Sequence, residues 1–424
     1  MATEKDTPDP PPVWARGDAF PEAPQGWGWV DAKGKTHPCD SPEKLMDAIR
    51  GDRDGSVNLV WTQENPRMIL PEELPGTGDA LRAARERWTR DDLEDVKHKL
   101  RWFGMACVGF GGWAFYQGLV RAGNPAGFPE RLNFAARTVL SSGQSGLALL
   151  MFLIFAFIPW YQARKRRREL GEWDDARIAA TVPAMRFETW LAWQKAPTTR
   201  ILLALMTVVG LAQLFCHVRT AGWDSLIAVF QNWDGIAEAG LVKGRYLQGE
   251  WWRLFTAPFL HGNIVHFLMN ASALIYLGRR LEVFARWPHL PMVFLFSACA
   301  GGEASARFVA APSVGASGGL MGWLGFLLVF ETLHKSLVPL SARRRLAAGV
   351  FLTALIGLVG YRYIDNAAHA GGLLAGMSYA AIVFPKSSST ERPNSTVADR
   401  IAGGACLVVL AASAFLAVSR IIGG

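Results

Sequence analysis

Charged residues are scarce in this chain of 424 residues: only 19% are Asp, Glu, Lys or Arg, whereas 50% are hydrophobic. Soluble domains average roughly a quarter charged residues, so the composition argues against one soluble globule and against a disordered chain. The scarcity is local, because residues 1–100 are polar and long stretches after residue 103 carry almost no charge. These unbroken apolar stretches also argue against a porin-type barrel, whose strands alternate apolar and polar residues.

Cysteine pairs and several protease signatures are also missing. The five cysteines form no CxxC pair and four lie in apolar segments, so we expect reduced side chains, without a disulfide framework or a zinc site. The sequence has no HExxH, which argues against a membrane zinc protease, and no GxGD; Asp365 has no second Asp near the last core helices to form an aspartyl pair. No basic segment followed by an apolar core opens the chain, so we expect no cleavable signal peptide.

Nine apolar runs are long enough, alone or beside neighbours, to form membrane-spanning helices. They are 103–120, 138–161, 201–218, 263–278, 291–311, 315–333, 346–361, 367–384 and 401–419. With nine spans the Lys- and Arg-rich loops fall on one side, which places the N-terminus in the cytoplasm and the C-terminus outside. We therefore predict a multi-pass protein of a bacterial cytoplasmic membrane, and we attribute the net charge of +8 to these loops and not to a nucleic-acid partner.

The polar first part of the chain divides into a leader, a domain and a linker. We expect a disordered leader over 1–26, then a small soluble α+β domain over 27–75, in which Ser41 caps a short helix between strands. This domain weakly resembles GYF-like adaptor modules and is a candidate for binding a cytoplasmic peptide or protein; a nondescript soluble cap is the alternative. Residues 78–101 predict a linker helix, and 162–200 predict a basic cytoplasmic loop.

Polar side chains inside apolar runs are costly, so each marks a candidate site. The first cluster lies in 251–270, where His266 and Asn270 are four residues apart and share one helix face. Both can donate hydrogen bonds from within the membrane, and His261 lies at the mouth of the same helix. The alternative is that such residues only link helices.

The second cluster is the segment VGASGGLMG, which begins an apolar helix. Ser317 lies between Gly315 and Gly318, beside free backbone N–H groups and the positive end of the helix dipole. Such a place suits a nucleophile whose substrate develops an oxyanion. A serine in a glycine-rich segment is also common for its small size alone.

The third cluster, DNAAHAGGLLAG, places His369 in the first turn of another apolar helix. Gly372 and Gly376 form a small-xxx-small face, which permits close helix packing. If the helices over 315–333 and 367–384 pack together, the imidazole reaches Ser317. A neutral imidazole there can accept the hydroxyl proton and later protonate the leaving amine.

Taken together and in this order, W-R, H-x-x-x-x-H-x-x-x-N, G-x-S-G and A-H-x-x-G-x-x-x-G resemble the rhomboid family of intramembrane serine proteases. The resemblance covers residues 200–384. It implies an all-α polytopic fold with a six-helix core over 201–384, joined by a seventh helix over 401–419. The two helices expected within 103–161 are additions to that core.

The resemblance also assigns roles at the matching positions. It implies Ser317 as nucleophile and His369 as base, with His266 and Asn270 lining the oxyanion hole. The supporting positions are Trp252 and Arg253 in the large first loop, His261, Gly315, Gly318, Gly372 and Gly376. The family often has an aromatic residue four positions after the nucleophile, where this chain has Met321.

The implied activity is endopeptidase cleavage of transmembrane segments in protein substrates, within membrane lipid and without a cofactor or metal. The rival interpretation is a catalytically inactive rhomboid-like protein that binds membrane clients. A transporter with polar helices is a further rival, but it predicts internal repeats, and we find none in the sequence.

Overall fold

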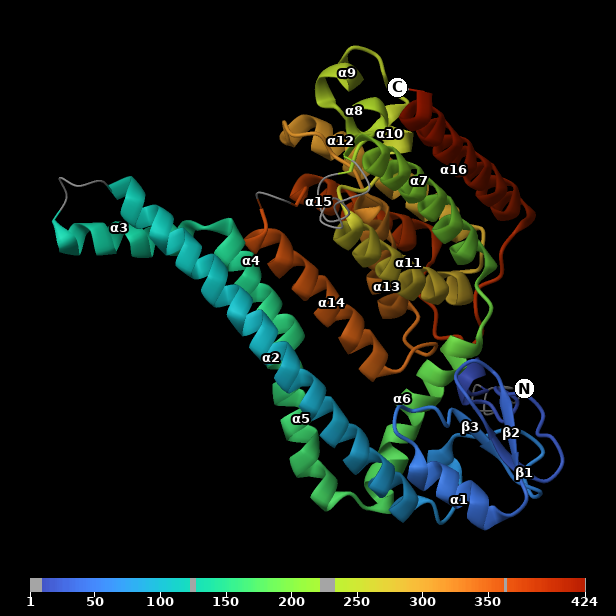
Figure 1. Ribbon diagram of the computed structural model, residues 1–424. Helices are drawn as coiled ribbons and strands as arrows, with labels where there is room; N and C mark the ends of the chain where they lie inside the picture. Colours follow the sequence, from blue (N-terminus) through green and yellow to red (C-terminus); the bar gives the residue numbers. More distant parts are fainter. Residues whose placement is uncertain (1–9, 123–126, 222–232, 362–363, 424) are drawn as a thin grey trace, which may run out of the picture. The chain divides into compact units, whose positions relative to one another are not determined.

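The computed structural model describes residues 10–122, 127–221, 233–361 and 364–423 (Figure 1). Contacts divide the chain into two compact units. One contains residues 14–190 together with 353–364, and the other contains mainly 191–352 and 365–424. We describe each unit in turn.

The first unit begins with a three-stranded antiparallel sheet in the order β2-β1-β3. Its elements are β1 (Trp27–Val30), β2 (Thr36–Cys39), α1 (Pro42–Gly51) and β3 (Leu59–Trp61). Ser41 caps α1 as predicted, since its side chain accepts a hydrogen bond from the N–H of Lys44. Leu45 and Ile49, four residues apart on one face of α1, are buried against Val60 of the sheet.

The expectation of a disordered leader over 1–26 is wrong for its described part. Residues Val13–Ala15 form a 3₁₀ helix, and Trp14 packs edge-on against Phe187 with ring centroids 5.8 Å apart. Arg186 donates hydrogen bonds to the backbone carbonyls of Trp14 and Arg16, at 3.0 and 2.6 Å. Burying the indole and satisfying these carbonyls orders the segment; residues 1–9 lie outside the described residues.

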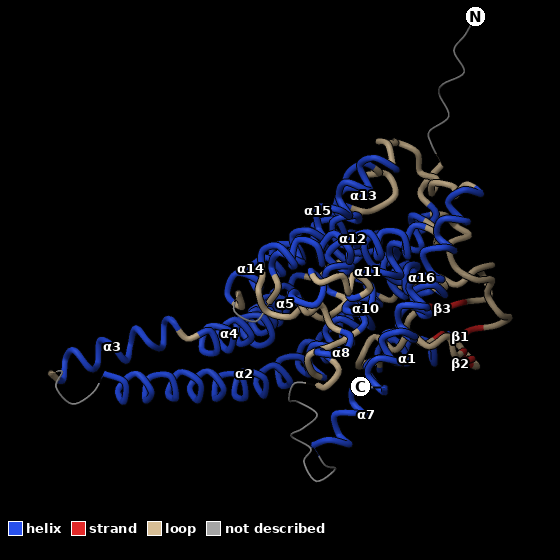
Figure 2. Tube along the Cα trace, turned by 90° about the horizontal axis from the view of Figure 1, so that it is seen from above, coloured by secondary structure: helices blue, strands red, loops and turns tan. Residues whose placement is uncertain are grey.

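A helical hairpin follows the sheet. Its elements are α2 (Gly78–Ala122), α3 (Phe128–Ser141), α4 (Gly143–Phe152), a π-helix (Leu153–Phe157) and α5 (Ile158–Glu169). The predicted linker helix and the first apolar run form the single helix α2, along which α3, α4 and α5 run back (Figures 1 and 2). The second apolar helix begins at Gly143 and not at 138, because the Ser142 side chain caps α4.

The prediction of a basic loop over 162–200 is wrong in its structure. Helix α5 continues to Glu169, and α6 (Asp175–Trp193) occupies most of the remainder. The Asp174 carboxylate accepts the Arg177 N–H at 2.8 Å, at the start of α6. The side chains of Phe187 and Trp190 are buried, so apolar packing favours the helix over a solvated loop.

The second unit is a helical bundle. Its helices are α7 (Pro197–Ala221), α11 (Ile264–Ala285), α12 (His289–Phe308), α13 (Ser317–Leu333), α14 (Leu340–Val359), α15 (Asn366–Val383) and α16 (Val397–Gly423). The described part of the loop between α7 and α11 contains the short helices α8 (Ile236–Ala239), α9 (Lys243–Leu247) and α10 (Arg253–Thr256), followed by a 3₁₀ helix (Ala257–Phe259). We call the described residues 233–263 the first loop. Each predicted apolar run after residue 200 corresponds to one helix.

Three helical stretches within the described ranges are long and apolar enough by themselves to cross a membrane: Gln144–Glu172, Pro197–Thr220 and Val397–Gly423. Helix α13 is apolar but shorter, with 17 residues.

Buried polar contacts fix the bundle. The Glu282 carboxylate accepts hydrogen bonds from the N–H groups of Thr198 and Thr199 at 3.0 and 2.9 Å. These donors in the first turn of α7 have no acceptor within their own helix. Arg280 and Glu331 form a fully buried pair that joins α11 to α13. Removing the charge of either residue would leave the other residue's charge unpaired inside the bundle.

Helix α16 packs on α7, α12 and the first loop. Gly403 lies against Pro288 so closely that a Cβ atom would be 2.6 Å from the Pro288 carbonyl oxygen. Near the other end of α16, the Cys216 thiol donates to the Ile421 carbonyl at 3.7 Å. The predicted seventh helix is therefore an integral part of this unit.

Candidate active site

The chain reaches Ser317 through a turn that only glycine adopts easily. Gly315 has φ +116°, in the left-handed region, and its N–H donates to the Ala257 carbonyl at 3.0 Å. A Cβ at Gly315 would lie 2.7 Å from the His266 ring and 3.3 Å from the Asn270 amide nitrogen. The backbone beside Ser317, which is the first residue of α13, thus runs against both of these side chains.

Helix α11 supplies the two polar groups that face this turn. Asn263 caps the helix by accepting the His266 N–H at 2.9 Å, which fixes the first turn. Asn270, one turn later, is 6% exposed, and its amide nitrogen has no hydrogen-bond partner within the described parts of the chain. A buried free donor is costly, so this amide is suited to a negatively charged oxygen of a bound group.

Glycines allow α13 and α15 to pack almost backbone to backbone. A Cβ at Gly372 would lie 2.0 Å from the Gly318 carbonyl oxygen, and one at Gly376 would lie 1.9 Å from that of Gly322. No other residue type fits these two positions without separating the helices. The first turn of α15, which carries His369, is thereby held against the first turn of α13.

A cavity of about 40 Å³ lies between these elements. Its lining includes Ser317 and Ala368, the residue before His369. A Cβ at Gly318 would lie 3.7 Å from the Ala368 carbonyl oxygen, so the backbone beside His369 lies against the residue that follows Ser317. The space is enough for water but not for a peptide segment, so a polypeptide substrate would require the surrounding elements to move.

Trp252 and Arg253 organise the first loop. Arg253 is buried and donates to the Gly240 carbonyl at 2.7 Å and to the Glu250 carboxylate at 2.5 Å. Two guanidinium groups lie near the Trp252 ring: the Cζ atom of Arg253 is 4.6 Å from the ring centroid, and that of Arg420 in α16 is 4.8 Å from it. These contacts tie the loop to the last helix, and neither side chain lines the small cavity.

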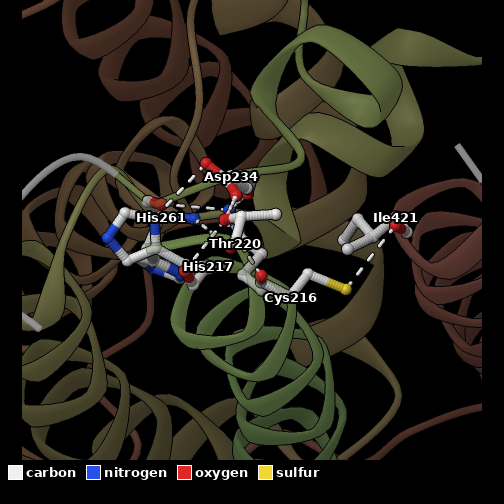
Figure 3. A network of polar contacts seen from close by, with 7 residues as sticks. Cys216, His217, Thr220, Asp234, His261 and Ile421 are labelled. Carbon is white, nitrogen blue, oxygen red and sulfur yellow. Dashed lines mark hydrogen bonds and ion pairs between the residues drawn. The ribbon is translucent and has the colours of Figure 1, made fainter. Parts of the chain in front are cut away.

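His261 is fully buried at the end of the first loop, with its ring 5.2 Å from that of His266. Gln213 of α7 fixes the backbone at His261, because its amide oxygen accepts the N–H at 2.8 Å and its amide nitrogen donates to the carbonyl at 3.1 Å. Figure 3 shows the adjoining contacts: Asp234 accepts from Thr220 at 2.6 Å and lies 3.3 Å from the His217 ring. The Thr220 hydrogen bond holds the pKa of Asp234 below its ordinary value.

Several polar residues of the site were missed by sequence reasoning. Gln213 is a polar side chain within an apolar run and could have been flagged on that ground. Lys243 and Asp365 carry no local signal that Ser305 and Ser313 connect them. Glu303 accepts a hydrogen bond from Tyr246 of the first loop, which raises the pKa of that phenol.

The fold and this site define a helical membrane protein with polar groups gathered inside an apolar bundle. Comparison with known proteins agrees: residues 248–386 match the Rhomboid domain. These residues therefore carry a Rhomboid domain, which confirms the resemblance stated from their motifs.

Three relatives illustrate the range of the family. The chain is 36% identical over 159 residues to RHOMBOID-like protein 6, mitochondrial, of Arabidopsis thaliana. The aligned residues cover 36% of this chain and 51% of that protein. It is 33% identical over 198 residues to Rhomboid protease GluP of Bacillus subtilis, covering 46% and 36% of the two chains. It is 32% identical over 139 residues to Inactive rhomboid protein 2 of Homo sapiens, covering 32% and 16%. The matches thus span about half or less of each relative.

Proposed function

We propose that this protein is an intramembrane serine endopeptidase that cleaves transmembrane segments of other membrane proteins. The observation that carries the proposal is the Gly315 turn, which brings the chain before Ser317 against His266 and the Asn270 amide nitrogen, a donor for which the described residues supply no partner. A merely structural serine would have no need of a buried donor aimed beside it.

The proposed reaction begins with a substrate helix that unwinds near its outer end, because a helical peptide bond is shielded by its own turns. The Ser317 oxygen attacks the carbonyl carbon while its proton passes to His369. The resulting oxyanion is held by the Ser317 N–H, His266 and Asn270. When the intermediate collapses, the C–N bond breaks and the leaving amine takes the proton from His369. Water then hydrolyses the acyl-enzyme, with His369 again as base.

We further propose that all nine predicted apolar helices span a bacterial cytoplasmic membrane, with the N-terminus inside. The basic residues between α4 and α7 and in the loops after α11, α13 and α15 support this orientation. The N-terminal domain then lies in the cytoplasm, where it is a candidate for binding a peptide or protein.

The rival function is client binding without catalysis, and the similarity to Inactive rhomboid protein 2 keeps it relevant. A fluorophosphonate probe separates the two, because it forms a covalent bond only with an activated serine. We expect labelling of the wild type and its loss in Ser317→Ala. The matched control is Ser272→Ala, an exposed serine of α11, which should label like the wild type. Absence of labelling in the folded wild type would favour client binding.

A further inference from the structure

A second polar cluster lies beside Ser317 and takes no part in the steps above. The Nζ atom of Lys243, a buried residue of α9, lies 2.7 Å from the Ser305 hydroxyl and 2.6 Å from the Ser313 hydroxyl. Both hydroxyls also donate hydrogen bonds to one carboxylate oxygen of Asp365. We call these four residues the Lys243 network. It joins the first loop, the end of α12, the segment before α13 and the turn before α15.

The hydrogen bonds define the charges of the network. Each serine hydroxyl has one hydrogen, which goes to Asp365, so its lone pairs accept from the Lys243 ammonium. Burial would raise the pKa of Asp365, but the hydrogen bonds from both serines and from Ala368, with the Lys243 charge, hold it below its ordinary value. Burial lowers the pKa of Lys243 to about 8, which leaves it protonated at neutral pH. This is a relayed Lys–Asp ion pair, and not a serine activated by a neutral lysine.

The network ends on the helix that carries His369. Asp365 is the N-cap of α15: its side chain accepts the Ala368 N–H at 2.9 Å, and its backbone carbonyl accepts the His369 N–H at 3.1 Å. Its negative charge acts on the His369 imidazole. Ser313 and Asp365 also line the same small cavity as Ser317.

We propose that Asp365, held by the Lys243 network, is a positioning residue for His369. It fixes the first turn of α15 and supplies the fixed negative charge that stabilises the imidazolium formed while Ser317 is acylated. A Ser-His pair that has no carboxylate in direct contact with its imidazole would gain this stabilisation from a carboxylate one helical turn away. This role rests on the proposed protease function.

Asp365→Asn tests the charge, because the amide oxygen can still cap α15. We expect kcat to fall about tenfold with KM unchanged, because the imidazolium loses its nearby negative charge. The assay measures cleavage of a quenched fluorescent transmembrane peptide by the full chain in liposomes. Asp399→Asn, which removes a carboxylate from the first turn of α16, is the matched control and should keep the wild-type kcat.

The single variant leaves Lys243 buried without its counter-charge, so it can also unfold the protein. The double variant Lys243→Met/Asp365→Asn removes both charges. We expect its melting temperature to recover toward the wild-type value while kcat stays about tenfold low. Recovery of kcat in the double variant, or wild-type kcat in Asp365→Asn, would show a structural role only and overturn the proposal. A folded wild type that neither cleaves nor labels would instead overturn the protease function, and this role with it.

Discussion

The contact between α13 and α15 makes the sharpest prediction about how the site is assembled. Gly376→Ala would place a Cβ 1.9 Å from the Gly322 carbonyl oxygen, against a contact distance of about 3 Å or more in real structures. The helices must therefore move apart by about 1 Å. Overpacking of this kind costs about 1–3 kcal/mol of stability. A displacement of that size between reacting groups costs roughly 10²-fold in rate.

The assay compares the rate of fluorophosphonate labelling and the thermal unfolding midpoint in detergent. Gly404→Ala is the matched control, because Gly404 also lies within a helix but a Cβ there meets nothing within 4 Å. That variant should label normally and be as stable as the wild type or slightly more so, since Ala favours the helix over Gly. Wild-type labelling and stability in Gly376→Ala would refute the idea that these glycines position the dyad.

Two further predictions concern buried polar groups. Asn270→Ala should lower kcat by about 10²–10³-fold, because it removes one oxyanion donor. Peptide cleavage measures this loss, and calorimetry should show a melting temperature near that of the wild type. Glu331→Gln should destabilise the protein by about 3–5 kcal/mol, because Arg280 then stays buried opposite a neutral amide. Arg280→Met/Glu331→Leu should recover most of that loss in chemical unfolding; equal stability of the single variant and the wild type would contradict the argument.

The sequence predicts the helices of the bundle well, because each is an apolar run whose length and periodicity are local properties. The capped helix at Ser41 follows from an equally local signal. The leader was mispredicted because the burial of Trp14 against Phe187 depends on residues far away in the chain. Helix α6 was missed because the basic residues of 162–200 favour a solvated loop when they are considered without the buried packing of the helix.

Some residues of the candidate site were also predicted from the sequence, whereas other contacts of the site could not be. Ser317, His369, His266 and Asn270 were proposed from motifs, and their roles stay predictions until activity is measured. The Lys243 network could not be predicted, because its members come from four separate segments and none has a distinctive neighbour in sequence. Likewise, nothing local indicates that Arg420 of α16 reaches the Trp252 ring.

The most direct measurement of the central claim is mass spectrometry of the protein after reaction with the fluorophosphonate probe. Transfer of the hydroxyl proton from Ser317 to His369 predicts an adduct on the peptide that contains residue 317, at high yield in the wild type and absent from folded His369→Ala. An adduct on another serine, or an equal yield without the imidazole, would contradict the account.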